Sequence, residues 1–369
     1  MSAGALTYID DNVSLARHCE QWAQAPLLAL DTEFVRETTF YPIPGLLQLG
    51  IQGAQFLIDP LTIDDWAPLQ SLFAVAIPKV LHACGEDLEV FERLLGCLPQ
   101  PLFDTQVGAA LAGCGYGLGY QALVAQLLEI HVDKEHTRSN WVARPLSAEQ
   151  CRYASLDVAY LPQMFERISE RLATLGRLGW WHEEGERVIA QARTVTEPAA
   201  YYRKLSAGFR LRGAQVAALR DLCAWRELGA RQQDVPRGRI LKDAECLEIA
   251  RRLPMDINAL KRVPDVDVRR VEKRADAILD IVAAAVESAP DTWPEGVEPP
   301  LPREWGGRLS RLRDLVADRA QALDMPAELL ARKRDCEYLL RTGELPEVLT
   351  GWRMDVVGSA LLDLSDTFP

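Results

Sequence analysis

The stretch that most constrains the fold is an apolar segment, residues 27–34, that carries two carboxylates. Its sequence, Leu-Leu-Ala-Leu-Asp-Thr-Glu-Phe, has the length and apolar character of a buried β-strand. Successive side chains of a strand point to opposite faces, so Asp31 and Glu33 share one face and Thr32 lies on the other. Neighbouring carboxylates repel each other and are costly to bury. The segment therefore predicts either a bound dication or a strand end that emerges into solvent.

The composition is that of a globular protein with two or three domains. The chain has 369 residues, of which 48% are hydrophobic and 25% charged. We find no signal-peptide pattern and no apolar run long enough to cross a bilayer, so we expect no membrane association. The 8 cysteines form no CxxC pair. They predict reduced thiols in the cytoplasm rather than disulfides or a zinc site.

Charge is distributed unevenly along the chain. Residues 1–200 contain 13 Lys and Arg against 25 Asp and Glu, a balance of -12. Residues 201–275 contain 18 against 10, a balance of +8, and residues 276–369 contain 10 against 18, a balance of -8. A basic middle between acidic ends indicates separate domains. The acidic first part fits a site built of carboxylates, whereas the basic block is either a nucleic-acid contact or a solvated helical surface.

A second informative stretch, residues 80–91, predicts the end of a strand, a tight turn and the start of a helix. Its sequence is Val-Leu-His-Ala-Cys-Gly-Glu-Asp-Leu-Glu-Val-Phe. Asp87 lies in the first helical turn, where the helix dipole favours an anion. Glu86 and Glu89 are competing carboxylates that we expect to face solvent. An acidic first turn is common in helices, so Asp87 indicates a functional site only if other acids lie close to it in the fold.

A third stretch, residues 150–161, predicts a helix that presents a phenol and a carboxylate together. Ser147 and Gln150 form a capping-box pattern at its start. Tyr153 and Asp157 are four residues apart and therefore lie on one helix face. An isolated pair of this kind is more often a structural hydrogen bond.

The first part of the chain predicts a layered α/β or α+β domain. The segment that begins at Leu102 and contains Asp104 predicts a helix start with Asp104 as its N-cap. The expected strands are residues 6–9, 27–34, 46–51, 55–58 and 79–82.

Taken in order, these three stretches resemble the tyrosine-containing branch of the DEDD 3′–5′ exonuclease superfamily. The resemblance covers residues 6–175 and rests on Asp-Thr-Glu-Phe, on His-Ala-x-x-Glu-Asp-Leu-Glu-x-Phe and on Tyr-x-x-x-Asp. It implies a ribonuclease H-like domain, a mixed five-stranded sheet with flanking helices. Three short segments are more similar to the ribonuclease D family than to proofreading domains of DNA polymerases. They are Leu-Leu-Gln-Leu, Phe-Asp-Thr-Gln and Trp-Val-Ala-Arg-Pro-Leu.

The remainder of the chain resembles all-α HRDC domains, which follow the nuclease domain in that family. The segment that starts with Tyr-Tyr-Arg-Lys at residue 201 carries the resemblance, a Pro-rich linker follows, and the acidic helical tail resembles a second, more degenerate copy. The predicted boundaries are 1–195 for the exonuclease domain, 200–288 for the basic first HRDC domain, 289–307 for the linker and 308–369 for the second HRDC-like domain.

The resemblance also implies the chemistry. Asp31, Glu33, Asp87 and Asp157 match the four metal-binding acids, and Tyr153 matches the tyrosine that orients the attacking water. Four carboxylates form a hard oxygen site suited to two Mg²⁺ or Mn²⁺ ions rather than zinc. The expected partner is RNA with a 3′ end, such as a tRNA precursor or another small stable RNA, from which nucleoside 5′-monophosphates are released. We expect a monomer.

Eight side chains are predicted to contact the RNA on weaker grounds, because each is a cation, an aromatic ring or an amide near the expected path of the strand. They are Phe34, Gln48, Lys134, Trp141, Arg203, Lys204, Arg210 and Arg212. Two alternatives stay open. One is a DNA 3′–5′ exonuclease of the same fold that acts in repair, and the other is an inactive RNA-binding scaffold.

Overall fold

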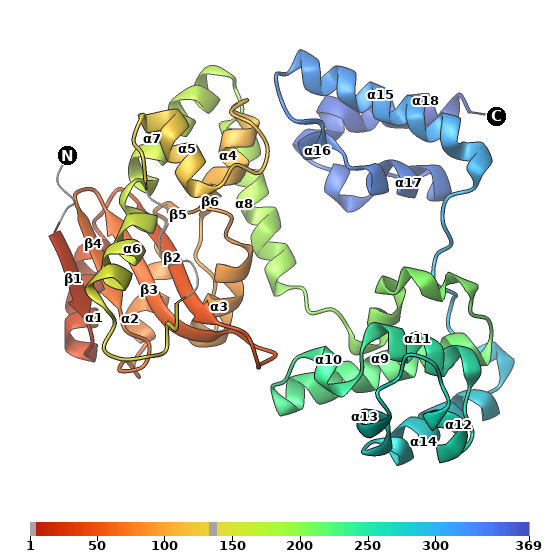
Figure 1. Ribbon diagram of the computed structural model, residues 1–369. Helices are drawn as coiled ribbons and strands as arrows, with labels where there is room; N and C mark the ends of the chain where they lie inside the picture. The colour runs from red at the N-terminus through yellow and green to blue at the C-terminus, as the bar shows by residue number, and fades with distance from the viewer. Residues whose placement is uncertain (1–4, 133–138, 369) are drawn as a thin grey trace. The chain divides into compact units, whose positions relative to one another are not determined.

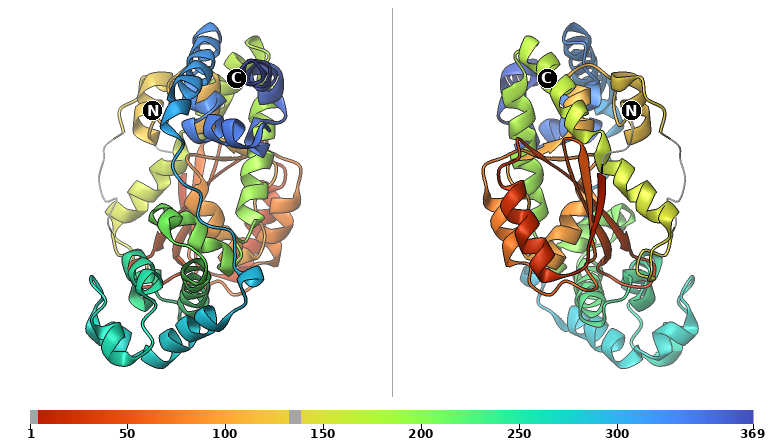
Figure 2. Two further views of the ribbon diagram at one scale, coloured as in Figure 1. Left: turned by 90° about the vertical axis from the view of Figure 1, so that its right-hand side faces the viewer. Right: turned by 90° about the vertical axis from the view of Figure 1, so that its left-hand side faces the viewer.

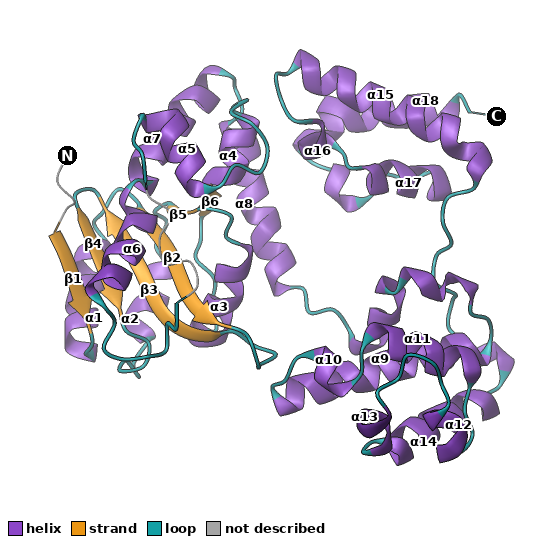
Figure 3. Cartoon of the chain, in the orientation of Figure 1, coloured by secondary structure: helices purple, strands orange, loops and turns teal. Residues whose placement is uncertain are grey.

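The computed structural model of the chain describes residues 5–132 and 139–368, and its contacts divide the chain into two compact units. The first unit comprises Met1–Val35, Pro42–Arg193 and Pro302–Pro369, and the second comprises Arg36–Tyr41 and Thr194–Leu301. Figure 3 shows strands only in the N-terminal part of the chain, and helices and loops elsewhere. Within the described residues, no helix has the length and apolarity needed to span a membrane.

The first unit is built on a mixed six-stranded sheet with the order β1-β4-β3-β2-β5-β6 (Figure 1). β3 pairs antiparallel with both β2 and β4, whereas the β1–β4, β2–β5 and β5–β6 pairs are parallel. The strands are β1 (Ala5–Ile9), β2 (Leu28–Val35), β3 (Ile43–Ile51), β4 (Ala54–Ile58), β5 (Lys79–Leu81) and β6 (Leu102–Asp104). The mixed sheet with flanking helices is thus confirmed, but the predicted number of five strands is wrong.

The sixth strand, β6, was expected to be the start of a helix. Leu102–Asp104 instead pairs parallel with β5, and Leu102 is buried. Three residues are fewer than one helical turn, so hydrophobic periodicity cannot distinguish a short buried strand from a helix start. The predicted N-cap is confirmed, because the Asp104 side chain accepts a hydrogen bond from Gln106 N and α4 begins at Thr105.

Helices cover both faces of the sheet, as Figures 1 and 2 show. One face packs against α1, α2 and α3 in a core that includes Leu28, Leu30 and Phe91. The other face packs against α6 around Leu46 and Trp141. In chain order, the helices of this part of the unit are α1 (Asn12–Trp22), α2 (Ala67–Ala74), α3 (Gly85–Leu95), α4 (Thr105–Leu111), α5 (Tyr120–Leu128), α6 (Ala148–Ala159), α7 (Leu161–Thr174) and α8 (Leu178–Arg193).

The C-terminal segment of the chain packs within the first unit against α8. Glu184 of α8 is 7% exposed and accepts hydrogen bonds from Arg353 Nη2 at 3.0 Å and from Trp352 Nε1 at 2.8 Å. The Trp352 ring stacks on Trp180, with ring centroids 4.6 Å apart. The elements of this segment are η4 (Arg303–Trp305), α15 (Gly306–Ala322), α16 (Ala327–Leu330), α17 (Lys333–Thr342), η5 (Glu347–Leu349), the π-helical turn η6 (Met354–Gly358) and α18 (Ser359–Asp366).

The second unit is helical and has its own apolar core around Leu219, Leu222 and Ile278. The short segment Arg36–Tyr41 belongs to it, because Asp234 Oδ1 accepts hydrogen bonds at 3.0 Å from the backbone N–H groups of Phe40 and Tyr41. Its helices are η1 (Pro198–Lys204), η2 (Ser206–Arg210), α9 (Ala214–Gln233), α10 (Arg237–Ile240), α11 (Asp243–Arg252), α12 (Ile257–Lys261), α13 (Val268–Glu272), α14 (Ala275–Glu287) and η3 (Pro290–Thr292).

Candidate active site

Strand β2 supplies two of the acids. Asp31 lies opposite Gln48 of β3, and Glu33 lies opposite Leu46, so both carboxylates project from the face of the sheet that α6 covers. The register of the β2–β3 pair shifts between Glu33 and Phe34. Such an irregularity ends the regular ladder and re-aims the side chains next to it.

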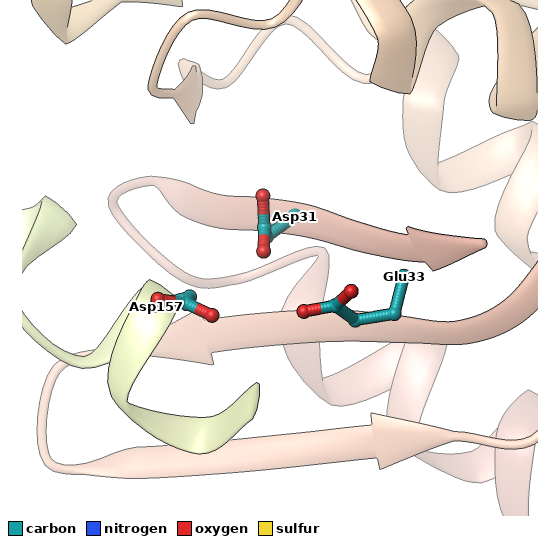
Figure 4. A group of neighbouring side chains, drawn as sticks. All are labelled: Asp31, Glu33 and Asp157. Atoms are coloured by element: carbon teal, nitrogen blue, oxygen red, sulfur yellow. The ribbon is translucent and has the colours of Figure 1, made fainter. Parts of the chain in front are cut away.

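Helix α6 brings a third carboxylate to this face. The predicted capping box is confirmed, since Ser147 Oγ accepts from Gln150 N and Gln150 Oε1 accepts from Ser147 N. The helix carries Asp157 to the two strand acids. One ligand oxygen from each of Asp31, Glu33 and Asp157 lies within 4.8 Å of the other two. Figure 4 shows these three side chains beside one another.

This close approach of α6 to the sheet depends on a glycine. Gly50 of β3 lies under α6, and a Cβ atom at this position would be 2.8 Å from the Val158 carbonyl oxygen and 3.1 Å from Val158 Cβ. Any side chain here would push the helix, together with the neighbouring Asp157, away from β2. The sequence pattern alone gives no signal for this requirement, because Gly50 is simply one residue of an apolar strand.

Asp87 is not one of the three acids that lie within 4.8 Å of one another, but its charge acts on Asp31 and Glu33 from the other side of the sheet. β5 pairs with β2 only at Leu28 and Ala29, so it leaves the next part of the β2 edge uncovered. Asp87, in the first turn of α3, fills this position, and its Oδ1 accepts a hydrogen bond of 2.5 Å from Thr32 Oγ1. Thr32, whose side chain points away from the strand acids, therefore positions the fourth acid, a role that sequence reasoning missed.

Burial and mutual repulsion raise the pKa of all four acids. Burial, followed by the charges of Asp157 and Asp87, raises the pKa of Glu33 to about 9. Burial raises the pKa of Asp157 to about 7 and that of Asp87 to about 6, although hydrogen bonds from Tyr153 and Thr32 oppose the change. The pKa of Asp31 is raised well above its ordinary range by burial and by the other three charges. Nearby positive charge would relieve this repulsion.

The residues present fit a divalent metal centre. All the donors are carboxylate oxygens, which are the ligands of hard cations such as Mg²⁺, Mn²⁺ and Ca²⁺. The three clustered acids are only partly buried, so an ion and a substrate can reach them. Gln48, opposite Asp31, is 1% exposed, and neither its amide N nor its amide O has a hydrogen-bond partner among the described residues. A buried amide whose N and O both lack a partner indicates a bound polar species beside the acids.

Tyr153 is placed next to the cluster. Burial raises the pKa of its hydroxyl, and so do the charges of Asp157, Glu33 and Asp31 and its hydrogen bond to Asp157. The phenol therefore stays protonated at neutral pH and acts as a hydrogen-bond donor. Its ring lies 6.1 Å from that of Trp141, centroid to centroid, within the apolar cluster under α6.

An ion pair between the partly exposed Arg144 and the buried Asp59 anchors the loop before α6. Arg144 donates to both carboxylate oxygens of Asp59 at 2.6 Å, to Gly45 O at 2.7 Å and to Trp141 O at 2.8 Å. Tyr8 donates to the same carboxylate at 2.7 Å. Burial alone would raise the pKa of Asp59, but the hydrogen bonds from Arg144 and Tyr8 hold it below its ordinary value. These residues are far apart in sequence, and nothing in their local patterns links them.

A second anchor fixes the turn before α3. Asp104 accepts hydrogen bonds from the backbone N–H groups of Ala83 at 3.0 Å and Cys84 at 3.1 Å. Ala83 has a φ of 56°, a left-handed conformation that is unfavourable for a residue with a side chain. Asp104 thus serves both as the cap of α4 and as a support for the helix that carries Asp87. Its capping pattern was a signal for the first role only.

The predicted RNA contacts fall into two groups in the structure. In the first unit Phe34 is partly exposed, Gln48 and Trp141 are buried at 1% and 2% exposure, and Lys134 lies outside the described residues. An RNA contact by Gln48 or Trp141 would require these side chains to be uncovered. For all eight residues the contact with RNA stays a prediction.

The other four predicted contacts, all cations, belong to the second unit. Arg203 pairs with Glu295 at 3.2 Å, Lys204 and Arg210 lie over the rings of Tyr201 and Phe209, and Arg212 donates to the Phe209 carbonyl oxygen.

We expect Gly50→Ala to lower kcat by about tenfold or more, because displacement of a reacting group by as little as 1 Å can cost about 10²-fold. Thermal unfolding should show a loss of about 1–3 kcal/mol from overpacking. Gly179→Ala in α8 is the matched control, since its Cβ would have no atom within 4 Å. Equal kcat values for the two variants would contradict a close-packing role for Gly50.

The geometry agrees with comparisons to known proteins. Residues 6–173 match the family model described as 3′-5′ exonuclease, and residues 215–282 match the HRDC domain. The chain is 42% identical over 370 residues to ribonuclease D of Pseudomonas paraeruginosa, with 98% of each chain covered. It is 37% identical over 369 residues to ribonuclease D of Granulibacter bethesdensis, and this alignment covers 98% of the present chain and 92% of the relative.

A solved structure is similar over almost the whole length. The crystal structure of Escherichia coli RNase D, described as an exoribonuclease involved in structured RNA processing, superposes with a TM-score of 0.91 at 32% identity. The match covers 98% of this chain and 99% of that one. With full-length similarity in sequence and fold, the chain belongs to the ribonuclease D family.

Proposed function

We propose that the protein is a 3′–5′ exoribonuclease that trims the 3′ ends of tRNA precursors and other small structured RNAs. The observation that carries the proposal is the convergence of Asp31, Glu33 and Asp157 within 4.8 Å, with Asp87 acting on the same charges. Family membership supports the reaction class, and the relative described as a processor of structured RNA supports the substrate class.

Asp31, Glu33, Asp87 and Asp157 would hold two divalent cations, Mg²⁺ or Mn²⁺. Such ions, when bound, supply charge neutralisation for the phosphoryl oxygens and lower the pKa of water. The chain's own groups do the remaining work. Thr32 and Asp104 hold Asp87 in place. The Tyr153 hydroxyl donates its proton to Asp157, and its oxygen would accept a hydrogen bond from the attacking water and so orient that water toward the terminal phosphodiester. Hydrolysis releases a nucleoside 5′-monophosphate and leaves a new 3′-hydroxyl.

Tyr153→Phe tests the orienting role. We expect kcat on a short RNA to fall by about 10²-fold, because the attacking water loses the hydroxyl that orients it. Mn²⁺ affinity, measured by calorimetry, should stay within twofold, since the carboxylates are retained. Tyr160→Phe at the end of the same helix is the control. If Tyr153→Phe turned over at the wild-type rate, the phenol would have no part in orienting water.

The experiment that tests the proposed function is a product-size assay on a tRNA with a 3′ extension, with and without Mn²⁺. Stepwise loss of 3′ nucleotides as 5′-monophosphates is the expected result. A matched DNA extension, degraded faster than the RNA, would favour a DNA exonuclease. Binding of the tRNA without any release of nucleotides would favour an inactive scaffold.

We also propose that the protein is a cytoplasmic monomer. All eight cysteines are free, and six of them are buried, which is consistent with a reducing compartment. Light scattering at micromolar concentration tests the oligomeric state, and a mass near 41.2 kDa is the expected result.

A further inference from the structure

A hollow of about 420 Å³ on the second unit has five cations among its eight lining residues. We call it the basic hollow. It lies where α10, α13 and the start of α14 meet. Its lining residues are Gln233, Val235, Arg239, Asp267, Arg269, Arg270, Lys273 and Arg274.

Most of this positive charge is not neutralised by the protein. Arg270 is engaged, because its Nη1 donates to the buried Glu245 at 2.8 and 2.9 Å and its Nη2 lies 3.6 Å from Asp267. For the other four cations, the described residues provide no carboxylate within ion-pair distance. These four are Arg239, Arg269, Lys273 and Arg274. Five cations thus face two carboxylates, an excess of three positive charges at one place.

Several other basic side chains of the same unit have an acid beside them. Arg251 and Arg252 both pair with Glu248, and Lys261 pairs with Glu272 at 2.7 Å. Lys204, Arg210 and Arg212 also lack a carboxylate within ion-pair distance among the described residues, so what distinguishes the hollow is that four such cations line one cavity. Keeping several like charges together without acids costs free energy, and a bound anion removes that cost.

The lining also limits the kind of anion. None of the lining residues is aromatic, so the hollow has no surface on which a base could stack. Arginine and lysine side chains bind phosphate oxygens without regard to base sequence. A volume of about 420 Å³ lies in the range of ligand sites and is large enough for a sugar–phosphate segment.

We propose that the basic hollow binds the sugar–phosphate backbone of the body of a structured RNA substrate. This inference rests on the proposed exoribonuclease function and adds to it the part of the second unit that holds the RNA. It places the main phosphate contact at Arg239, Arg269, Lys273 and Arg274 rather than at Arg203, whose guanidinium is already paired.

The test compares two triple variants of the full-length protein that lose the same charge. One removes exposed cations of the hollow by Arg239→Gln, Arg269→Gln and Lys273→Gln, and the control removes paired cations by Arg251→Gln, Arg252→Gln and Lys261→Gln. Affinity for a tRNA with a 3′ extension is measured from low to high salt, with Asp31→Asn in each protein to prevent degradation. Circular dichroism verifies folding of each variant.

We expect the hollow variant to bind about tenfold or more weakly at 0.1 M salt and to show a salt slope smaller by about two to three. The control variant should lose less than threefold. Equal losses in the two variants, or no loss in the hollow variant, would overturn the inference.

A separate measurement keeps this result distinct from the proposed function. With Asp31 restored, both triple variants should degrade a trinucleotide at the wild-type rate, because so short a substrate needs only the acidic cluster. A trinucleotide that the wild-type protein leaves intact would overturn the exoribonuclease proposal. The two binding curves would still decide whether the hollow holds RNA.

Discussion

Asp31→Asn is expected to abolish nucleotide release and, at the same time, to stabilise the metal-free protein. Asp31 interacts with the charges of Asp87, Asp157 and Glu33, and burial adds to their repulsion. The amide has almost the same shape but no charge, so the variant removes a repulsion from the folded state. The rate should fall by about 10³-fold or more, because the site loses a ligand for the cations that stabilise the transition state.

Thermal unfolding with and without Mn²⁺ measures the second effect. In chelator the melting temperature of Asp31→Asn should exceed that of the wild type. On addition of Mn²⁺ the wild-type protein should gain stability by mass action, whereas the variant should gain little. Glu86→Gln, an exposed acid beside Asp87 on α3, is the control and should behave as the wild type. A merely tenfold loss of rate in Asp31→Asn would contradict a metal-binding role.

Local sequence patterns were sufficient to identify the elements that carry the acids of the candidate site but not their supports. The acids of β2, the acidic first turn of α3 and the Tyr153–Asp157 pair each have a short-range signature, namely strand alternation or helical spacing. Their order along the chain carried the family resemblance. Which of these elements approach one another is decided by packing, and the resemblance supplied that information.

The supports depend on tertiary structure and were therefore missed. Thr32 is an ordinary strand residue until α3 brings Asp87 beside it. Asp59 and Arg144 are 85 positions apart, and only the folded sheet brings them together. Gly50 matters because of the Val158 carbonyl of another element. The miscounted strand has a different cause, since three residues in β6 are too few to display a period.

The largest stability effect is expected from Arg353→Met at the contact between α8 and the C-terminal segment. Arg353 is 4% exposed and Glu184 is 7% exposed, and the guanidinium also donates to Leu329 O at 2.8 Å. Methionine approximates the volume of the arginine stem but leaves the buried Glu184 carboxylate with Arg187 Nε, 3.6 Å away, as its remaining cation. Removal of one partner of a buried ion pair costs about 3–5 kcal/mol. Hydrogen exchange should therefore show the C-terminal helices opening far more often, and the protein should melt at lower temperature.

A double-mutant cycle separates the ion pair from simple packing. Glu184→Gln combined with Arg353→Met no longer buries a carboxylate that has lost its guanidinium partner, so the double variant should be more stable than Arg353→Met alone by about 1–3 kcal/mol. Arg334→Met in α17, whose side chain is 72% exposed, controls for the substitution itself and should change stability by less than about 0.5 kcal/mol. Glu184 also accepts a hydrogen bond from the indole N–H of Trp352. A double variant less stable than Arg353→Met would mean that this hydrogen bond, and not the charge on Arg353, is the main contribution of Glu184 to stability.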